Sequence, residues 1–173
     1  MEYVVAILQI LIPAGIVFLT AWLLLKRMLD HFRDQVLNDL KAEARKVTIP
    51  VRLQAYERMV LLLERINPEN LIMRIHRKES SAQSFQLELI AAVRSEFEHN
   101  LSQQVYISST GWEMVKNAKE EILKLINTSM GQLKDGDDSK DLSRVIFEQI
   151  MVSKQGPTNE ATEYLKQEIR KLF

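Results

Sequence analysis

The strongest constraint on how this chain folds is an uncharged, apolar run near its N-terminus. No Asp, Glu, Lys or Arg occurs from Tyr3 to Leu25. As an α-helix rising about 1.5 Å per residue, this run would reach roughly 34 Å, which exceeds the hydrocarbon core of a bilayer at about 30 Å. Pro13 and Gly15 fit such a segment, because helices in lipid tolerate both residues better than helices in water do. We therefore expect residues 3–25 to form a single transmembrane helix.

The residues around this run argue against a cleaved signal peptide and predict an orientation. A signal peptide carries positive charge before its apolar run and small residues after it. Here Glu2 precedes the run, and Trp22-Leu23-Leu24-Leu25 leads directly into basic residues. A helix in a soluble core would also carry a polar face, which this run lacks. Because Lys26, Arg27 and Arg33 follow the span, the positive-inside rule places the N-terminus outside and the C-terminal domain in the cytoplasm.

Composition narrows what the remainder of the 173 residues does. The chain carries 23 Lys and Arg against 23 Asp and Glu, so it lacks the basic stripe of a nucleic-acid-binding protein. It contains no cysteine, which excludes disulfides, thiolate metal sites and thiol nucleophiles. Glycine and proline are scarce, which favours helices over a turn-rich β fold. We expect an all-α protein: one N-terminal transmembrane helix followed by a cytoplasmic helical bundle.

A narrow apolar stripe follows the predicted span. Residues 26–47 read as a juxtamembrane helix, and its apolar side chains recur every three or four residues. This helix is either a solvated stalk, or its stripe lies on a partner helix or on a second copy of the chain. Thr48-Ile49-Pro50 is expected to end it, because the residue before a proline avoids the α conformation. The stripe consists of Leu29, Phe32, Val36, Leu40, Ala44 and Val47.

Residues 48–133 are predicted to form the helical bundle domain. Pro50 suits the first position of a helix with a broad apolar face that includes Met59, Leu63 and Ile66. Asn67-Pro68-Glu69 is typical of a new helix start, and Ser80 with Gln83 forms a capping-box pattern. In the third helix the predicted core stripe ends on Phe97, Leu101 and Val105. The expected helices of this domain cover about 50–66, 68–77, 82–106 and 111–133.

The C-terminal part is predicted to be a separate element. Residues 134–140 contain no apolar side chain other than glycine, which indicates a flexible hinge. Beyond it, residues 141–173 are expected to form a helical arm with helices at about 141–153 and 159–172. Such an arm could dock on the bundle or insert into the groove of a partner.

One pattern suggests a metal site. Glu96 and His99 are spaced Glu-x-x-His on a predicted helix, the spacing found in helical di-iron and di-manganese proteins. Those proteins need two such motifs and further glutamates, and this chain has one copy. We find no catalytic constellation and predict no cofactor, so a metal-dependent enzyme using the Glu96/His99 region is the alternative and not the favoured hypothesis.

A polar network between helices explains the same region better. Side chains three or four residues apart around Glu96 can bond across to the helix that begins at Pro50. We therefore predict a structural or partner-binding network made of Arg52, Tyr56, Arg58, Glu96, His99, Asn100, Gln103 and Tyr106.

Two stretches also carry a family resemblance. Arg52-Leu53-Gln54-Ala55-Tyr56-Glu57-Arg58 runs on to Leu63-Glu64-Arg65-Ile66-Asn67-Pro68, and residues 96–108 read EFEHNLSQQVYIS. With the predicted anchor, they resemble an uncharacterised family of small, N-terminally membrane-anchored helical proteins from Bacteroidota-type bacteria. The resemblance covers about residues 1–130 and leaves out 134–173. It implies a location in the bacterial inner membrane and brings no known activity, cofactor or partner.

These observations favour a membrane-anchored, non-catalytic accessory or scaffold subunit of an inner-membrane complex. Its expected partners are other subunits of a membrane complex or a cytosolic client protein, bound through the cytoplasmic helical domain. Nucleic acid is not expected as a partner. The stripe over 26–47 leaves a homo-oligomeric structural membrane protein as a further alternative.

Overall fold

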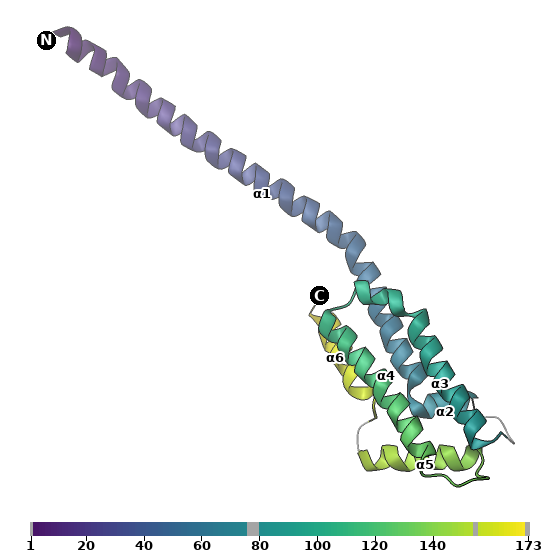
Figure 1. The fold of residues 1–173 in the computed structure, drawn as a ribbon. Helices are drawn as coiled ribbons and strands as arrows, with labels where there is room; N and C mark the ends of the chain where they lie inside the picture. The colour runs from purple at the N-terminus through teal and green to yellow at the C-terminus, as the bar shows by residue number, and fades with distance from the viewer. Residues whose placement is uncertain (1, 76–79, 154–155, 172–173) are drawn as a thin grey trace. The chain divides into compact units, whose positions relative to one another are not determined.

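Helices make up most of the described chain. The computed structural model describes residues 2–75, 80–153 and 156–171, without the side chains of residue 2 and residues 4–13. Six α-helices and one short 3-10 helix occupy these residues (Figure 1), so the expectation of an all-α protein is confirmed. They are α1 (Glu2–Ile66), α2 (Pro68–Ile75), α3 (Ala82–His99), the 3-10 helix η1 (Leu101–Val105), α4 (Ser109–Met130), α5 (Ser139–Ser153) and α6 (Asn159–Arg170).

Helix α1 is uninterrupted from Glu2 to Ile66 (Figure 1), so the helix end expected at Thr48-Ile49-Pro50 is wrong. Pro50 has no N–H to donate to the carbonyl of Lys46, which removes one hydrogen bond from the helix. Just before the proline, the Thr48 hydroxyl donates to the Ala44 carbonyl oxygen at 2.8 Å. The helix continues on both sides of Pro50 despite the loss of this one hydrogen bond.

The chain divides into two units, Met1–Thr48 and Ile49–Phe173. In the first unit, every described side chain from residue 14 to residue 48 is exposed. Within the part of the chain that the structure describes, no helix is both long and apolar enough to cross a membrane. The expected transmembrane segment, residues 3–25, includes residues 4–13, whose side chains lie outside the description.

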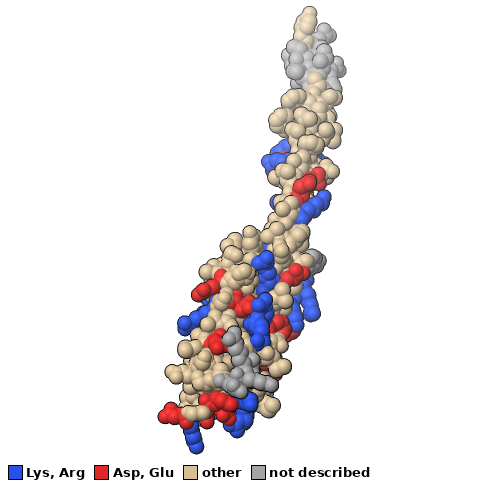
Figure 2. All heavy atoms as spheres, turned by 90° about the vertical axis from the view of Figure 1, so that its right-hand side faces the viewer, with Lys and Arg blue, Asp and Glu red and all other residues tan. Residues whose placement is uncertain are grey.

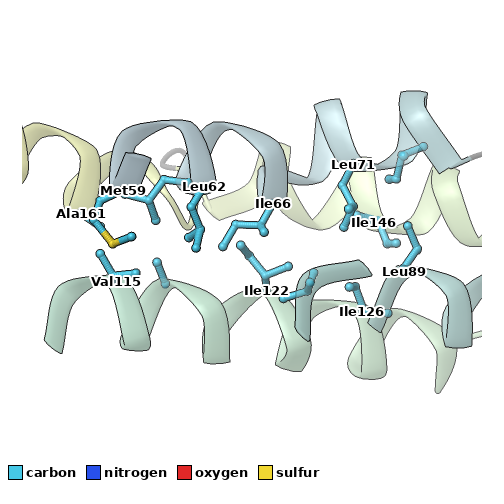
Figure 3. Packing of buried hydrophobic residues seen from close by; sticks show 14 of the residues in the cluster. Met59, Leu62, Ile66, Leu71, Leu89, Val115, Ile122, Ile126, Ile146 and Ala161 are labelled. Atoms are coloured by element: carbon cyan, nitrogen blue, oxygen red, sulfur yellow. The ribbon is translucent and has the colours of Figure 1, made fainter. Parts of the chain in front are cut away.

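The second unit is built around an apolar core between α1 and α4. Met59, Leu62 and Ile66 of α1 lie opposite Val115 and Ile122 of α4 (Figure 3), and all five are buried. The α1 residues are spaced by three and four and the α4 residues by seven, so each set lies on one face of its helix. Helix α4 also contacts α3, α5 and α6. The predicted core residues Met59, Leu63 and Ile66 are therefore confirmed.

Helices α5 and α6 belong to this core and do not form a separate arm. Leu142 and Ile146 of α5 and Leu165 of α6 are completely buried, and Ala161 is 2% exposed. Helix α5 packs on α3 and α4, and α6 packs on α4. Helices α5 and α6 of the predicted arm therefore pack on the bundle, and their buried side chains are part of its core.

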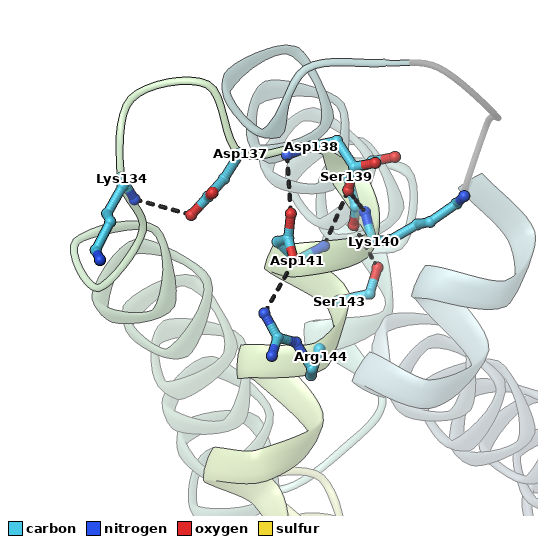
Figure 4. A network of polar contacts seen from close by, with 8 residues as sticks. All are labelled: Lys134, Asp137, Asp138, Ser139, Lys140, Asp141, Ser143 and Arg144. Atoms are coloured by element: carbon cyan, nitrogen blue, oxygen red, sulfur yellow. Dashed lines mark hydrogen bonds and ion pairs between the residues drawn. The ribbon is translucent and has the colours of Figure 1, made fainter.

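The segment predicted as a flexible hinge, residues 134–140, is bonded to the start of α3. The N–H of Ser139 donates to the Ser80 carbonyl at 3.0 Å, and the N–H of Ala82 donates to the Asp137 carbonyl at 3.3 Å. Within the segment, the Lys134 N–H donates to the Asp137 carboxylate at 2.9 Å (Figure 4). The polar composition of residues 134–140 predicted a flexible hinge. In the structure, the polar groups of this segment form hydrogen bonds that involve backbone groups.

The third predicted helix ends earlier than expected. Asn100 is the C-cap of α3, and the chain continues as η1. Leu101 is 44% exposed and Val105 is 77% exposed, so the prediction that both lie in the core is wrong. The change to a 3-10 helix alters the number of residues per turn, and the apolar periodicity of α3 does not continue across it.

Candidate partner-binding surface

The residues of the predicted polar network do not all bond to one another, and the Glu96 carboxylate forms ion pairs with two other residues. Its Oε1 atom lies 2.7 Å from Arg65 Nη2 and 3.1 Å from Arg74 Nη1. Arg74 also donates to the Arg65 carbonyl at 3.2 Å. The region around Glu96 was expected to bond to Arg52, Tyr56 or Arg58 of α1. Glu96 instead joins the last turns of α1 and α2 to α3, and its side chain is 17% exposed.

The group around Glu96 is unsuited to the metal site considered from the sequence. The Glu96 carboxylate is held by two arginines, and His99 is exposed at the end of α3. Among the residues that the structure describes, no group of three or more His, Asp or Glu side chains is placed to hold an ion. Among the described residues, the side chains of His99 and Arg58 make no hydrogen bond or ion pair.

The second group of bonds joins α1 to the end of η1. The Arg52 Nε atom donates to the Tyr106 carbonyl at 3.1 Å. Asn100, which is 7% exposed, donates its amide to the Glu96 carbonyl at 2.9 Å, and its own carbonyl accepts from the Gln103 N–H at 3.0 Å. These bonds hold the α3–η1 turn in place. Their role is structural, since backbone groups take up most of them.

Tyr56 has a charged neighbour that the sequence did not predict, Glu168 of α6. Both side chains have a buried oxygen, Tyr56 Oη and Glu168 Oε2, without a hydrogen bond in the described structure. Burial raises the pKa of Tyr56 and the negative charge of Glu168 raises it further, while the Arg52 guanidinium lowers it. A signal for Glu168 exists in the sequence: it lies between Leu165 and Ile169 on the apolar face of its helix.

Close packing at the start of α4 accommodates Glu168. A Cβ atom at Gly111 would lie 2.9 Å from Glu168 Oε2 and 3.1 Å from Leu165 Cδ2, so the glycine leaves the space that the carboxylate occupies. The first turn of α4 has N–H groups without helical partners, and its dipole favours a nearby negative charge. Glu168 therefore fixes α6 against the N-terminal end of α4.

An open apolar groove lies beside Tyr56, between α1 and α6. Its volume is about 420 Å³. Leu61 is 59% exposed and Leu53 is 37% exposed along its α1 side, and Glu57 and Lys166 supply one charge of each sign. We call this the α1–α6 groove; it is lined by Leu53, Tyr56, Glu57, Val60, Leu61, Leu165, Lys166 and Ile169.

A second groove lies between α2 and α5, with a volume of about 680 Å³. Two methionines border it, Met73 and Met151, and about four-fifths of each side chain is exposed. Methionine side chains are flexible and adapt to partners of different shape. We call this the α2–α5 groove; it is lined by Ile72, Met73, Lys140, Ser143, Arg144, Phe147, Glu148 and Met151.

The charged surface around the second unit does not favour one sign of partner. Lys and Arg side chains alternate with Asp and Glu over the face shown in Figure 2. Several pairs are local, such as Lys166 with Glu163 at 2.9 Å and Arg144 with Asp141 at 2.9 Å. The features that distinguish this surface are therefore its two apolar grooves.

The fold defines an all-α protein in which a long N-terminal helix leads into a compact helical unit. The chain belongs to a family of unknown function, DUF7935, which matches residues 2–172. The match includes α5 and α6, beyond residue 130 where the resemblance seen in the sequence was expected to stop. No curated protein and no solved structure matches the chain.

Proposed function

We propose that this protein is a membrane-anchored, non-catalytic accessory or scaffold subunit that binds partner proteins through its compact helical unit. The observation that supports this proposal is the pair of open apolar grooves, α1–α6 and α2–α5. Exposed apolar side chains grouped in grooves between helices are characteristic of protein-binding surfaces.

The α1–α6 groove suits an amphipathic helix of a partner protein. Such a helix would place its apolar face against Leu53 and Leu61, which the fold leaves exposed. Its polar flanks would meet Glu57 on one helix and Lys166 on the other. This arrangement orients the partner through charges of opposite sign while the apolar contact supplies most of the binding free energy.

The membrane anchor in this proposal rests on the sequence. The uncharged run from Tyr3 to Leu25 has the length of a bilayer span, and Lys26 and Arg27 follow it. We propose the bacterial inner membrane as the location, with the compact unit in the cytoplasm. An anchored unit meets membrane partners at a high effective concentration, so weak groove contacts suffice.

Co-purification tests the proposal. The full-length chain is extracted from native membranes in mild detergent, and associated proteins are identified and quantified by mass spectrometry. We expect stoichiometric membrane or cytosolic partners that are lost with Leu61→Asp, because the charge would be buried against the partner's apolar face. The control is Leu87→Asp on α3, where a leucine of similar exposure (62%) lies outside both grooves.

Two results would contradict the proposal. One is a solitary protein at native expression levels. The other is a set of partners unaffected by Leu61→Asp and by Met73→Asp in the α2–α5 groove, because binding would then bypass both surfaces.

A further inference from the structure

The first unit carries an apolar stripe that nothing in its own unit covers. Between residues 14 and 48 the described side chains of α1 are all exposed. It is the stripe predicted from the sequence, extended by Leu25 at its N-terminal end, and its large side chains, Leu25, Leu29, Phe32, Val36, Leu40 and Val47, are 41–70% exposed. A long helix in water gains most of its stability from packing an apolar face. The uncovered stripe therefore indicates a surface that packs against another helix.

The spacing of the stripe is that of a coiled coil in its first half. From Trp22 to Val36 the apolar residues follow each other at intervals of 3, 4, 3 and 4, the heptad pattern. After Val36 the next interval is four residues, to Leu40, which is a stutter that locally unwinds a supercoil. A second helix can therefore follow this stripe along its length.

A hollow on this face has the form of a coiled-coil hole. Trp22, Leu25, Lys26 and Leu29 stand at positions i, i+3, i+4 and i+7 and surround a depression of about 230 Å³, bordered also by Asp30. In knobs-into-holes packing, four residues at this spacing receive one side chain of the facing helix. In a parallel pair with both helices in the same register, that side chain is Leu25 of the second copy.

The same knobs-into-holes arrangement is expected one heptad further along the helix. The next hole is formed by Leu29, Phe32, Arg33 and Val36, and it receives Phe32 of the second copy. With roughly 60–120 Å² of apolar surface buried per side chain, Trp22 and the stripe of two copies together would bury about 1,000 Å². This area reaches the lower bound of specific protein interfaces, about 1,000 Å².

We propose that two copies of this chain pair in parallel through the α1 stripe, with each Leu25 and each Phe32 filling a hole of the other copy. The proposal concerns the first unit alone and leaves both grooves of the compact unit free for other partners. The pairing uses residues 22–47, of which Trp22 and Leu25 lie within the run proposed as the membrane anchor. A scaffold built in this way would present each groove twice.

Disulfide crosslinking tests the pairing directly, because the native chain has no cysteine. Single cysteines are placed on the stripe, Leu29→Cys and Val36→Cys, and on the opposite face of α1, Asp34→Cys and Arg45→Cys. The full-length variants are oxidised in the membranes of the expressing cells and analysed on non-reducing gels. We expect a disulfide-linked dimer from the two stripe positions and only background from the opposite face.

A second variant removes the contact without touching the compact unit. In the Val36→Cys background, Phe32→Asp places a charge in the hole, and the dimer should be lost. Asn38→Asp, on the opposite face of the same helix, should leave the dimer unchanged.

Three results would overturn the proposal. One is an equal yield of dimer from both faces, or none from the stripe. Another is crosslinking of a mixture of Leu29→Cys and Val47→Cys chains when neither forms a dimer alone, which indicates antiparallel pairing. The last is a crosslinked product whose mass shows a different protein on the stripe. None of these results affects the co-purification test of the grooves.

Discussion

At the residue scale, the buried polar atoms at the α1–α6 contact are the least expected feature. Tyr56 is 2% exposed, yet its hydroxyl makes no hydrogen bond in the described structure, and neither does Glu168 Oε2. Burying polar atoms without partners costs free energy, which apolar packing around them must offset. Tyr56 thus contributes its ring to the core and to the α1–α6 groove, and its hydroxyl lies under the influence of the Arg52 and Glu168 charges.

The pH dependence of stability should reveal this environment. The pKa of Tyr56 is raised above its usual value of 10.0, so the folded state holds the proton more tightly than the unfolded state. Its contribution is fully present below about pH 10 and is lost as pH rises through the higher folded pKa. We expect denaturant unfolding to show a larger loss between about pH 9 and pH 11 in the wild type than in Tyr56→Phe.

At neutral pH the Tyr56→Phe variant tests whether the tyrosine hydroxyl contributes to the free energy of unfolding. Tyr56→Phe should change the free energy of unfolding by less than about 1 kcal/mol, because it removes an unbonded hydroxyl. A large loss of stability at neutral pH would mean that the hydroxyl has a partner after all.

The carboxylate of Asp138 caps the N-terminus of α5. We expect this cap to require either the ionised carboxylate or another capping side chain at position 138. Its Oδ1 atom accepts from the N–H groups of Lys140 at 2.8 Å and Asp141 at 3.1 Å, and its own N–H donates to Asp141 Oδ2 at 3.3 Å (Figure 4). These backbone bonds, with Asp141 first, hold the pKa of Asp138 below its usual 3.8. This reciprocal pattern is a capping box.

We expect Asp138→Ala to lower Tm at neutral pH, and Asp138→Asn to retain most of the stability, because asparagine also caps helices well. Since the folded pKa is lowered, the stabilisation is present above about pH 4 and is lost as pH falls through the folded pKa. Thermal unfolding monitored by circular dichroism measures both effects. Equal Tm values for the wild type and Asp138→Ala at pH 7 would show that the cap is not needed.

At the scale of elements, α5 and α6 decide whether the C-terminal part is integral to the fold. Ile146→Ala removes a completely buried side chain and should cost about 2–5 kcal/mol in denaturant unfolding. Met151→Ala, on the same helix at an 80% exposed position, should cost less than about 0.5 kcal/mol. If both variants unfold like the wild type, α5 is a dispensable arm, as the sequence first suggested.

Helix positions could be predicted from the sequence where local signals are strong. Asn67-Pro68-Glu69 was expected to open a helix, and α2 begins at Pro68 with the Glu69 N–H bonded to Asn67 Oδ1 at 3.0 Å. The capping box predicted at Ser80 is displaced by one residue: Ser81 is the N-cap of α3 and accepts from the Ser84 N–H at 3.2 Å. Adjacent serines offer the same chemistry, so sequence alone does not choose between them.

The failures arise where a local signal is compatible with more than one outcome. Pro50 disfavours a helix locally, yet α1 continues through it. Glu96 pairs with Arg65 and Arg74 although Arg52 and Arg58 were equally plausible by spacing. The choice among arginines depends on how α1, α2 and α3 cross. That geometry is set by the whole core and is absent from any single helix pattern.

At the scale of the whole molecule, the chain is divided into two units, Met1–Thr48 and Ile49–Phe173. The first unit is a helix that carries the proposed anchor and the proposed pairing stripe. The second is a compact bundle whose polar groups serve mainly structural bonds and whose two apolar grooves are available to partners. In the proposed function, tethering such a bundle to a membrane would make it a scaffold for its partners.

The most direct test of this account is alkaline carbonate extraction of the full-length protein from native membranes, followed by immunoblotting of pellet and supernatant. The account predicts that the protein stays in the membrane pellet, because the run from Tyr3 to Leu25 is held in the hydrocarbon core. Recovery of the protein in the soluble fraction would contradict it.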